Sequence, residues 1–157
     1  MQVPDDAQAH KEASVEIAAR PEAVYDLVSD LTRMGEWSPE ATGGEWRDGG
    51  RGQVGDWFIG HNKAGDREWS REAQVAVADR GREFTFVVGG VEANCTWWCY
   101  EMQPSATGTR LTEKWWFVNK TPGLATATEE QLRTRIEATQ GALEATIAAV
   151  KATAEAG

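Results

Sequence analysis

The sequence predicts an α+β fold in which a curved antiparallel β-sheet wraps around one long C-terminal helix. Short stretches rich in Trp, Phe, Val and Thr alternate with glycine-rich spacers over residues 42–118, which is typical of strands joined by hairpins. A single helical periodicity follows and fills the end of the chain. Because such a helix must bury its apolar face, we expect it to lie across the concave side of the sheet.

A polar tail and one short strand are expected at the N-terminus. Residues 1–12 carry no hydrophobic pattern, so we expect a flexible tail there and a single domain over residues 13–157. A chain of 157 residues and 17.2 kDa can bury a sizeable core as one domain. Within it, Val15 and Ile17 alternate with small or polar neighbours, as in a short strand.

Two short helices are expected after this strand. Pro21 suits the first position of a helix and Glu22 suits the positive end of the helix dipole, so a helix should run to about Val28. Leu31 then begins a second short amphipathic segment, which ends at Ser38-Pro39.

Strands and one long helix account for the rest of the chain. The glycine-rich spacers divide the region from Thr42 to Val118 into about five or six hairpin-linked strands. Thr128 and Gln131 then form a capping box, the signature of a helix N-terminus. A helix of about 25 residues is predicted to follow, with an apolar face formed by Leu132, Ile136, Thr139, Leu143, Ile147 and Val150.

Composition argues against several classes of function. The 16 Lys and Arg residues face 25 Asp and Glu, and the net charge of −9 repels nucleic-acid phosphates and anionic membranes. No apolar run is long enough to span a membrane, and the acidic N-terminus differs from a signal peptide. Cys95 and Cys99 lie too far apart on one expected strand to form a disulfide, so free thiols are expected. We therefore expect a cytoplasmic protein with no nucleic-acid partner and no membrane span.

Neither a metal nor a cofactor is expected. His10 and His61 are the two histidines of the chain, too few for a histidine-rich metal centre, and His10 falls in the expected tail. A nucleophile-histidine-acid triad is equally hard to assemble. The glycines of GGRGQVG precede no helix and therefore fail the structural test for a phosphate-binding loop.

Strand alternation predicts which side chains face the concave side, since residues i, i+2 and i+4 share a face. On the strand that contains Arg71, the inward set includes Val75 and Val77. Asn62, Arg71 and Glu113 are then polar side chains among apolar ones. The full set of expected ligand-binding residues comprises Phe58, Asn62, Trp69, Arg71, Phe84, Phe86, Trp98, Tyr100, Glu113, Trp115, Ile136 and Leu143.

Glu113 and Arg71 are the candidate catalytic residues, because buried charges are costly unless they meet a partner, water or ligand. Arg71 would orient a ligand carboxylate, carbonyl or enolate. Glu113 would accept a ligand hydroxyl or act as a general base with a pKa raised by burial. The alternatives are a structural ion pair between the two, or a register that places Glu113 on the solvent face.

Two pairs of tryptophans have other expected roles. Trp97 and Trp116 should point away from the concave side, where together they would form an apolar patch for a homodimer or another partner. Burial of this pair under the N-terminal tail is the alternative. Trp37 and Trp46 are expected to anchor the small helices and the first hairpin.

Five segments of the chain stand in a characteristic order: PEAVYDLVSDLTRMGEWSPE with the GGEW tryptophan, GDWFIGHNKAGDREW, ADRGREFTFVV, TWWCYEM and GTRLTEKWW. Together they resemble the START-like (SRPBCC) superfamily, and most of all its bacterial polyketide cyclase/dehydrase-like branch, over residues 13–153. It implies a helix-grip fold whose cavity takes small apolar or amphipathic molecules. Members of the superfamily include carriers, hormone receptors, aromatase/cyclases and stress proteins, so the fold alone does not define a function.

Three functions follow as expectations. The first is binding of a small lipid-like, aromatic or polyketide-like molecule in a cavity between the sheet and the C-terminal helix. The second is an aromatase/cyclase or dehydratase that uses Arg71 and Glu113 on a polyketide-like intermediate. The third is a partner-binding protein whose cavity is collapsed and whose exposed aromatic residues contact a macromolecule.

Overall fold

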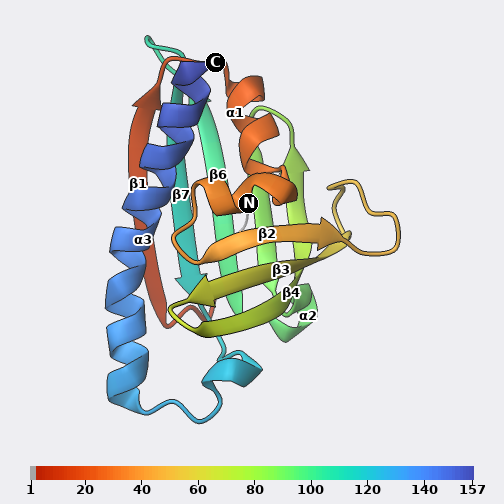
Figure 1. Cartoon of the computed structure of the whole chain (residues 1–157), viewed down its shortest axis with the longest axis vertical. Helices are drawn as coiled ribbons and strands as arrows, with labels where there is room; N and C mark the ends of the chain where they lie inside the picture. Colours follow the sequence, from red (N-terminus) through yellow and green to blue (C-terminus); the bar gives the residue numbers. More distant parts are fainter. Residues whose placement is uncertain (1–2) are drawn as a thin grey trace.

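The computed structural model describes residues 3–157 and contains one antiparallel sheet in the order β1-β7-β6-β5-β4-β3-β2 (Figure 1). Every neighbouring pair of strands is antiparallel, so hairpin connections build most of the sheet and β1 joins its far edge beside β7. The strands are β1 (Ala9–Ile17), β2 (Ala41–Trp46), β3 (Trp57–Ala64), β4 (Arg67–Asp79), β5 (Glu83–Val88), β6 (Thr96–Pro104) and β7 (Thr109–Phe117).

Helices cover one face of this sheet. The long helix lies along β1 and β7, and the two short helices after β1 lie beside its C-terminal half (Figure 1). The predicted curved sheet with a long C-terminal helix is therefore confirmed. The helical segments are α1 (Pro21–Val28), η1 (Leu31–Glu36), α2 (Gly90–Ala93), η2 (Pro122–Leu124) and α3 (Glu129–Ala156).

Helix α3 forms for the reasons that its sequence indicates. The Thr128 hydroxyl accepts a hydrogen bond from the Gln131 backbone N–H at 3.1 Å, and the Gln131 side chain accepts from the Thr128 N–H at 2.9 Å. This capping box satisfies two backbone donors that a helix N-terminus otherwise leaves free. Leu143, Ile147 and Val150 are each at most 3% exposed and anchor the helix on the sheet.

The N-terminal strand is longer than predicted. We expected order to begin near Ala13, but β1 begins at Ala9 and pairs with β7 from Ala9 opposite Phe117 to Ile17 opposite Thr109. Residues 1–2 of the expected tail lie outside the described residues. The strand is an edge strand, and such strands carry polar side chains without losing their backbone pairing.

Two further details of the sheet differ from the expectation. A bulge between Val75 and Val77 moves Val77 off the concave face, because Val77 lies opposite Thr85 while Ala78 lies opposite Phe84. The segment after β5 was expected to be a turn and instead forms the single helical turn α2. The six strands that follow α1 agree with the predicted number.

Trp97 and Trp116 do not form an exposed patch. Trp116 is 6% exposed and stacks on the His10 ring of β1 with centroids 4.7 Å apart. Trp97 is partly buried and its indole N–H donates to the Asn94 side chain at 2.5 Å. The N-terminal strand thus covers Trp116 through His10, as the alternative expectation stated, whereas Trp97 is hydrogen-bonded to Asn94.

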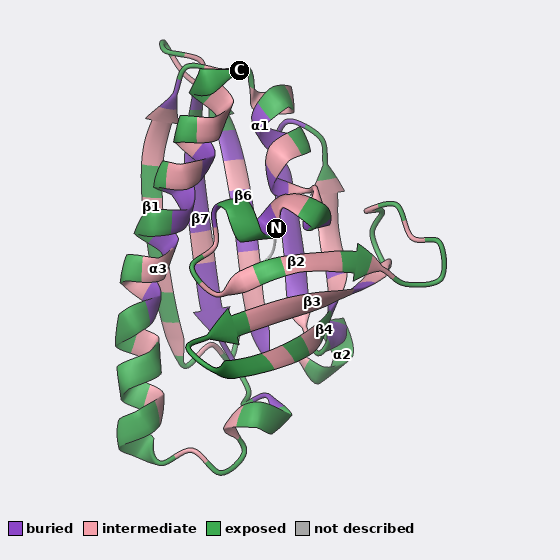
Figure 2. Ribbon diagram, viewed as in Figure 1, coloured by how far each residue is buried: buried purple, intermediate pink, exposed green. Residues whose placement is uncertain are grey.

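The apolar core occupies the half of the molecule nearest α1 and the C-terminus of α3, where buried residues alternate along the central strands (Figure 2). Cys95 and Cys99 are buried free thiols, as predicted. Across residues 3–157, no helix has the length and apolar character that crossing a membrane requires. The core members with no exposed surface include Ile17, Val24, Val28, Val75, Phe84 and Leu111.

Candidate functional site

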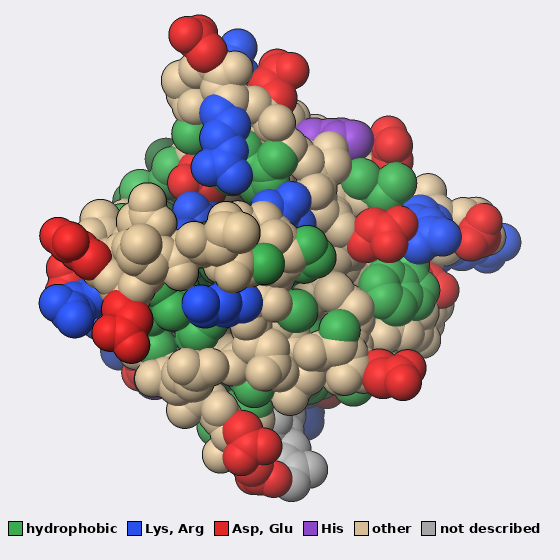
Figure 3. Space-filling view, turned by 90° about the horizontal axis from the view of Figure 1, so that it is seen from below, with side chains coloured by type: hydrophobic (Ala, Val, Ile, Leu, Met, Phe, Trp, Pro, Cys, Tyr) green, Lys and Arg blue, Asp and Glu red, His purple; other side chains and the backbone are tan. Residues whose placement is uncertain are grey.

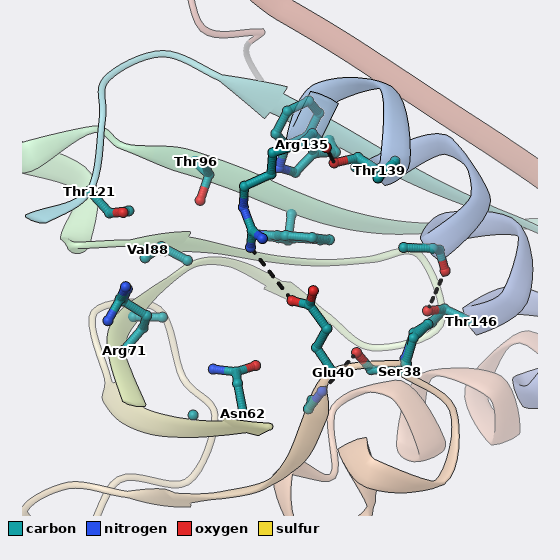
Figure 4. Close-up of a pocket in the computed structure, with 18 of the residues that line it drawn as sticks. Ser38, Glu40, Asn62, Arg71, Val88, Thr96, Thr121, Arg135, Thr139 and Thr146 are labelled. Carbon is teal, nitrogen blue, oxygen red and sulfur yellow. Dashed lines mark hydrogen bonds and ion pairs between the residues drawn. The ribbon is translucent and has the colours of Figure 1, made fainter. Parts of the chain in front are cut away.

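A cavity of about 440 Å³ lies between the concave face of the sheet and α3. Strands β3 to β7 form its floor, α3 forms one wall, and the segment from η1 to β2 forms the opposite wall. Figure 4 shows side chains from the sheet, from α3 and from this segment turned toward a common space. The cavity is open, so the expectation of a collapsed interior is wrong.

Aromatic rings line the floor of the cavity as a continuous row. Phe58 and Phe86 meet edge to face at 5.2 Å between centroids, and Phe86 stacks on Trp98 at 6.4 Å. Trp98 contacts Trp115 at 6.3 Å, and Trp115 stacks on Phe117 at 6.3 Å. Phe86 lies opposite Trp98, and Trp98 lies opposite Trp115, so their side chains share the concave face, and Phe117 joins them two residues beyond Trp115. The row offers a flat apolar surface that suits ringed or chain-like molecules.

Glu113 projects from β7 into this apolar surface. Its side chain is 2% exposed, and its Oε1 atom has no hydrogen-bond partner among residues 3–157. Burial raises the pKa of Glu113 to about 8, an effect that a hydrogen bond with Tyr100 partly opposes. At neutral pH the carboxyl group is therefore mostly protonated, and it can donate as well as accept a hydrogen bond.

Tyr100 lies beside Glu113 on the concave face, because the two residues are directly opposite each other on β6 and β7. The phenol is 3% exposed, and burial together with the neighbouring carboxyl group raises its pKa well above the ordinary value. Tyr100 therefore remains a neutral hydrogen-bond donor at physiological pH.

Trp37 is a second buried polar group of the cavity wall. It was expected to anchor the small helices, and it is 4% exposed, but it also lines the cavity. Within residues 3–157, the buried side-chain polar atoms that lack a partner are Trp37 Nε1 and Glu113 Oε1. Both belong to residues that line the cavity.

Arg71 also lines the cavity but forms no ion pair with Glu113, so the structural ion pair considered above is absent. Its guanidinium donates to the Ser70 backbone carbonyl at 3.0 Å and packs so closely against Gly123 of η2 that a side chain there would collide with it. Burial lowers the pKa of Arg71, and the nearby charges of Arg67 and Arg135 lower it further. The group stays charged, but at an electrostatic cost.

Charged residues surround the mouth of the cavity. Arg135 of α3 forms an ion pair with Glu40 at 3.5 Å, and Figure 4 shows this pair across the pocket from Arg71 and Asn62. Arg67 lies over the Trp69 ring, with 4.9 Å between its guanidinium carbon and the ring centroid. Sequence reasoning missed Arg67, Glu40 and Arg135. The same alternation that selected Trp69 and Arg71 also places Arg67 on their face.

The structure brings together most of the residues that the sequence indicated. All of the expected ligand-binding residues line the cavity except Phe84 and Leu143. Phe84 belongs to the solid core and contacts the Tyr25 ring edge to face at 5.9 Å. Leu143 lies behind the cavity wall, packed with Trp115 and Phe117.

The helical wall adds little free hydrogen-bonding capacity. Thr139 donates its hydroxyl to the Arg135 carbonyl at 3.0 Å, and Thr146 donates to the Ala142 carbonyl at 2.8 Å. These two hydroxyl protons are therefore not free for a ligand, and the charged donor that α3 supplies is Arg135. The arrangement supports apolar binding with a proton-exchanging group at the inner end and cations at the mouth.

Comparison with known proteins agrees with this architecture. The family model described as polyketide cyclase / dehydrase and lipid transport matches residues 8–155. A polyketide-cyclase-like protein of Corynebacterium glutamicum, solved by NMR, is 34% identical, with a TM-score of 0.63 over 92% of this chain and 90% of that chain. No curated protein sequence matches the chain.

Two aromatase/cyclases share the fold at low sequence identity. The Zhui aromatase/cyclase of a Streptomyces species is 17% identical, with a TM-score of 0.74 over 94% of this chain and 93% of that chain. The di-domain aromatase/cyclase StfQ of the steffimycin biosynthetic pathway is 13% identical, with a TM-score of 0.73 over 96% of this chain and 52% of that chain.

Proposed function

This chain belongs to the polyketide cyclase / dehydrase and lipid transport family, and from that premise we propose that it binds a small hydrophobic or aromatic molecule in the cavity between the sheet and α3. The observation that carries the proposal is the aromatic floor of the cavity. A volume of about 440 Å³ falls within the range of small-molecule sites, which combine an apolar lining with a few polar groups.

An aromatase/cyclase or dehydratase activity on a polyketide-like intermediate is the second candidate. It is favoured by one feature, a buried carboxyl group with a pKa raised to about 8, which is close to the value that suits a general acid or base at neutral pH. Arg71 would polarise a carbonyl or stabilise an enolate in such a reaction. Binding alone needs no proton transfer, so whether Glu113 exchanges a proton with the ligand separates the two candidates.

Filling the cavity tests the binding proposal. Ala142 lines the cavity from α3, and we expect Ala142→Trp to weaken binding of the fluorescent aromatic probe aminoanthracene at least about tenfold, because the indole occupies the space of the ligand. The measurement is a fluorescence titration of each purified protein with the probe.

Ala145→Trp is the matched control, since Ala145 lies on the exposed face of the same helix. It should bind the probe as the unmodified protein does. Equal binding by both tryptophan variants would place the probe outside the cavity and contradict the proposal.

A further inference from the structure

We propose that the molecule bound in this cavity is an amphipathic hydroxy acid, with its carboxylate at the arginine-lined mouth and its hydroxyl at the inner end beside Glu113. This inference rests on the proposed binding function and adds the chemical class of the ligand. Two observations carry it, both made within residues 3–157. Buried polar atoms of the cavity wall lack hydrogen-bond partners, and arginines at the mouth lack ion-pair partners.

Two buried polar atoms of cavity-lining residues lack a hydrogen-bonding partner within the described chain. Glu113 and Trp37 both line the cavity, and within residues 3–157 their Oε1 and Nε1 atoms are buried without a partner, whereas buried polar groups in folded proteins are almost always paired. An indole N–H donates, and a carboxyl oxygen accepts. A hydroxyl group can both accept and donate, so it is the small neutral group that complements either atom.

The mouth of the cavity carries an excess of positive charge. Arg67, Arg71 and Arg135 all line it, and Glu40 is paired with Arg135 alone. Within the described chain, Arg67 and Arg71 form no ion pair. This cluster is unusual in a protein whose net charge is −9. Seen from below, Lys and Arg side chains lie beside hydrophobic surface around a hollow (Figure 3). A guanidinium binds a carboxylate through two parallel hydrogen bonds, so an acid fits this end.

The sheet register keeps the two polar ends apart. Arg71 lies two residues beyond Ala73, which pairs with Val88 at the end of β5. Val88 pairs with Thr96 of β6, and Thr96 pairs with Phe117 at the end of β7. Glu113 lies four residues back from Phe117 along β7, a distance of about 13 Å at the usual rise of a strand. An apolar segment of the ligand would therefore lie along the row of aromatic rings between its two polar groups.

The test uses three probes of equal chain length that displace aminoanthracene. They are ω-hydroxylauric acid, which has both groups, lauric acid, which lacks the hydroxyl, and lauryl alcohol, which lacks the carboxylate. Their chains are flexible, so the distance between the two polar groups of the probe can adjust to the distance between the two ends of the cavity. We expect ω-hydroxylauric acid to bind about tenfold more tightly than either other probe, as one charged or buried hydrogen bond would provide.

Two variants test whether the hydroxyl of the probe binds at Glu113 and whether its carboxylate binds at the arginines. Glu113→Met should abolish the advantage over lauric acid, and the Arg67→Gln/Arg71→Gln double variant should abolish the advantage over lauryl alcohol. Arg80→Gln is the charge control, because Arg80 pairs with the exposed Asp26 and does not line the cavity. Retained binding of aminoanthracene shows that each variant is folded.

The outcomes separate the two proposals. If aminoanthracene binds in the cavity but the three probes displace it equally, the hydroxy-acid inference is wrong and the binding function stands. If a preference exists but survives in Glu113→Met and in the double arginine variant, the assignment of the two ends is wrong. If neither aminoanthracene nor any of the three probes binds, both proposals fail.

Discussion

Glu113→Gln is expected to stabilise the protein above about pH 8 and to change its stability little below about pH 4.5. The folded protein holds the Glu113 proton up to about pH 8, whereas the unfolded chain releases it near the ordinary value of 4.5. Between these two values the folded state binds more protons, so the free energy of unfolding of the unmodified protein falls as the pH rises. The slope is about 1.4 kcal/mol for each pH unit.

Glutamine keeps the size of the side chain but does not titrate. The free energy of unfolding of the variant therefore does not fall with pH on account of residue 113. Urea unfolding of both proteins from pH 5 to pH 9 measures the difference in the free energy of unfolding, which should grow up to about pH 8, reach several kcal/mol and then level off. The difference isolates Glu113, because other acids such as Asp26 and Asp56, whose pKa values are lowered, affect both proteins alike. Parallel stability curves would show that Glu113 is hydrated and titrates normally.

Leu143→Ala is expected to lower the free energy of unfolding by about 2–5 kcal/mol, because it removes a fully buried side chain and leaves a void. Leu143 packs against Trp115 and Phe117 behind the cavity wall, so the loss removes contacts between α3 and the sheet. The measurement is again urea unfolding, at a pH where Glu113 is neutral.

Leu132→Ala provides the matched comparison, as Leu132 lies on the same helix but is only partly buried at the mouth of the cavity. It should cost markedly less, since solvent replaces part of the lost contact. A loss in Leu143→Ala as small as that in Leu132→Ala would show that α3 does not pack on the sheet through Leu143.

The periodic elements of the fold could be predicted from the sequence. The apolar spacing of α3 with its capping box and the glycine-separated strands are local signals, so they lead directly to the observed elements. The start of β1 at Ala9 could not be predicted, because its polar residues form a strand only by pairing with β7, a hundred residues away. The bulge after Val75 depends on pairing with β5 for the same reason.

The candidate site was predictable along the strands but not across them. Alternation places Glu113 and Arg71 on the concave face, where the structure has them, yet it does not give the distance between them, and they form no ion pair. Alternation also fails to show how far the cavity extends, so Phe84 was assigned to it although it lies in the core. Glu40 and Arg135 come from a loop and from a helix face, whose orientation only tertiary packing determines.

Native mass spectrometry of the protein freshly purified from its own cells tests most directly whether the cavity holds a small molecule. We predict a noncovalent adduct at one molecule per chain that dissociates on collision, and that is lost in Ala142→Trp but kept in Ala145→Trp purified in the same way. Fragmentation of the released molecule would also show whether it carries a carboxylate and a hydroxyl. A protein that shows no adduct at any collision energy, and whose tryptophan fluorescence stays unchanged across a panel of hydrophobic ligands, would contradict the binding function.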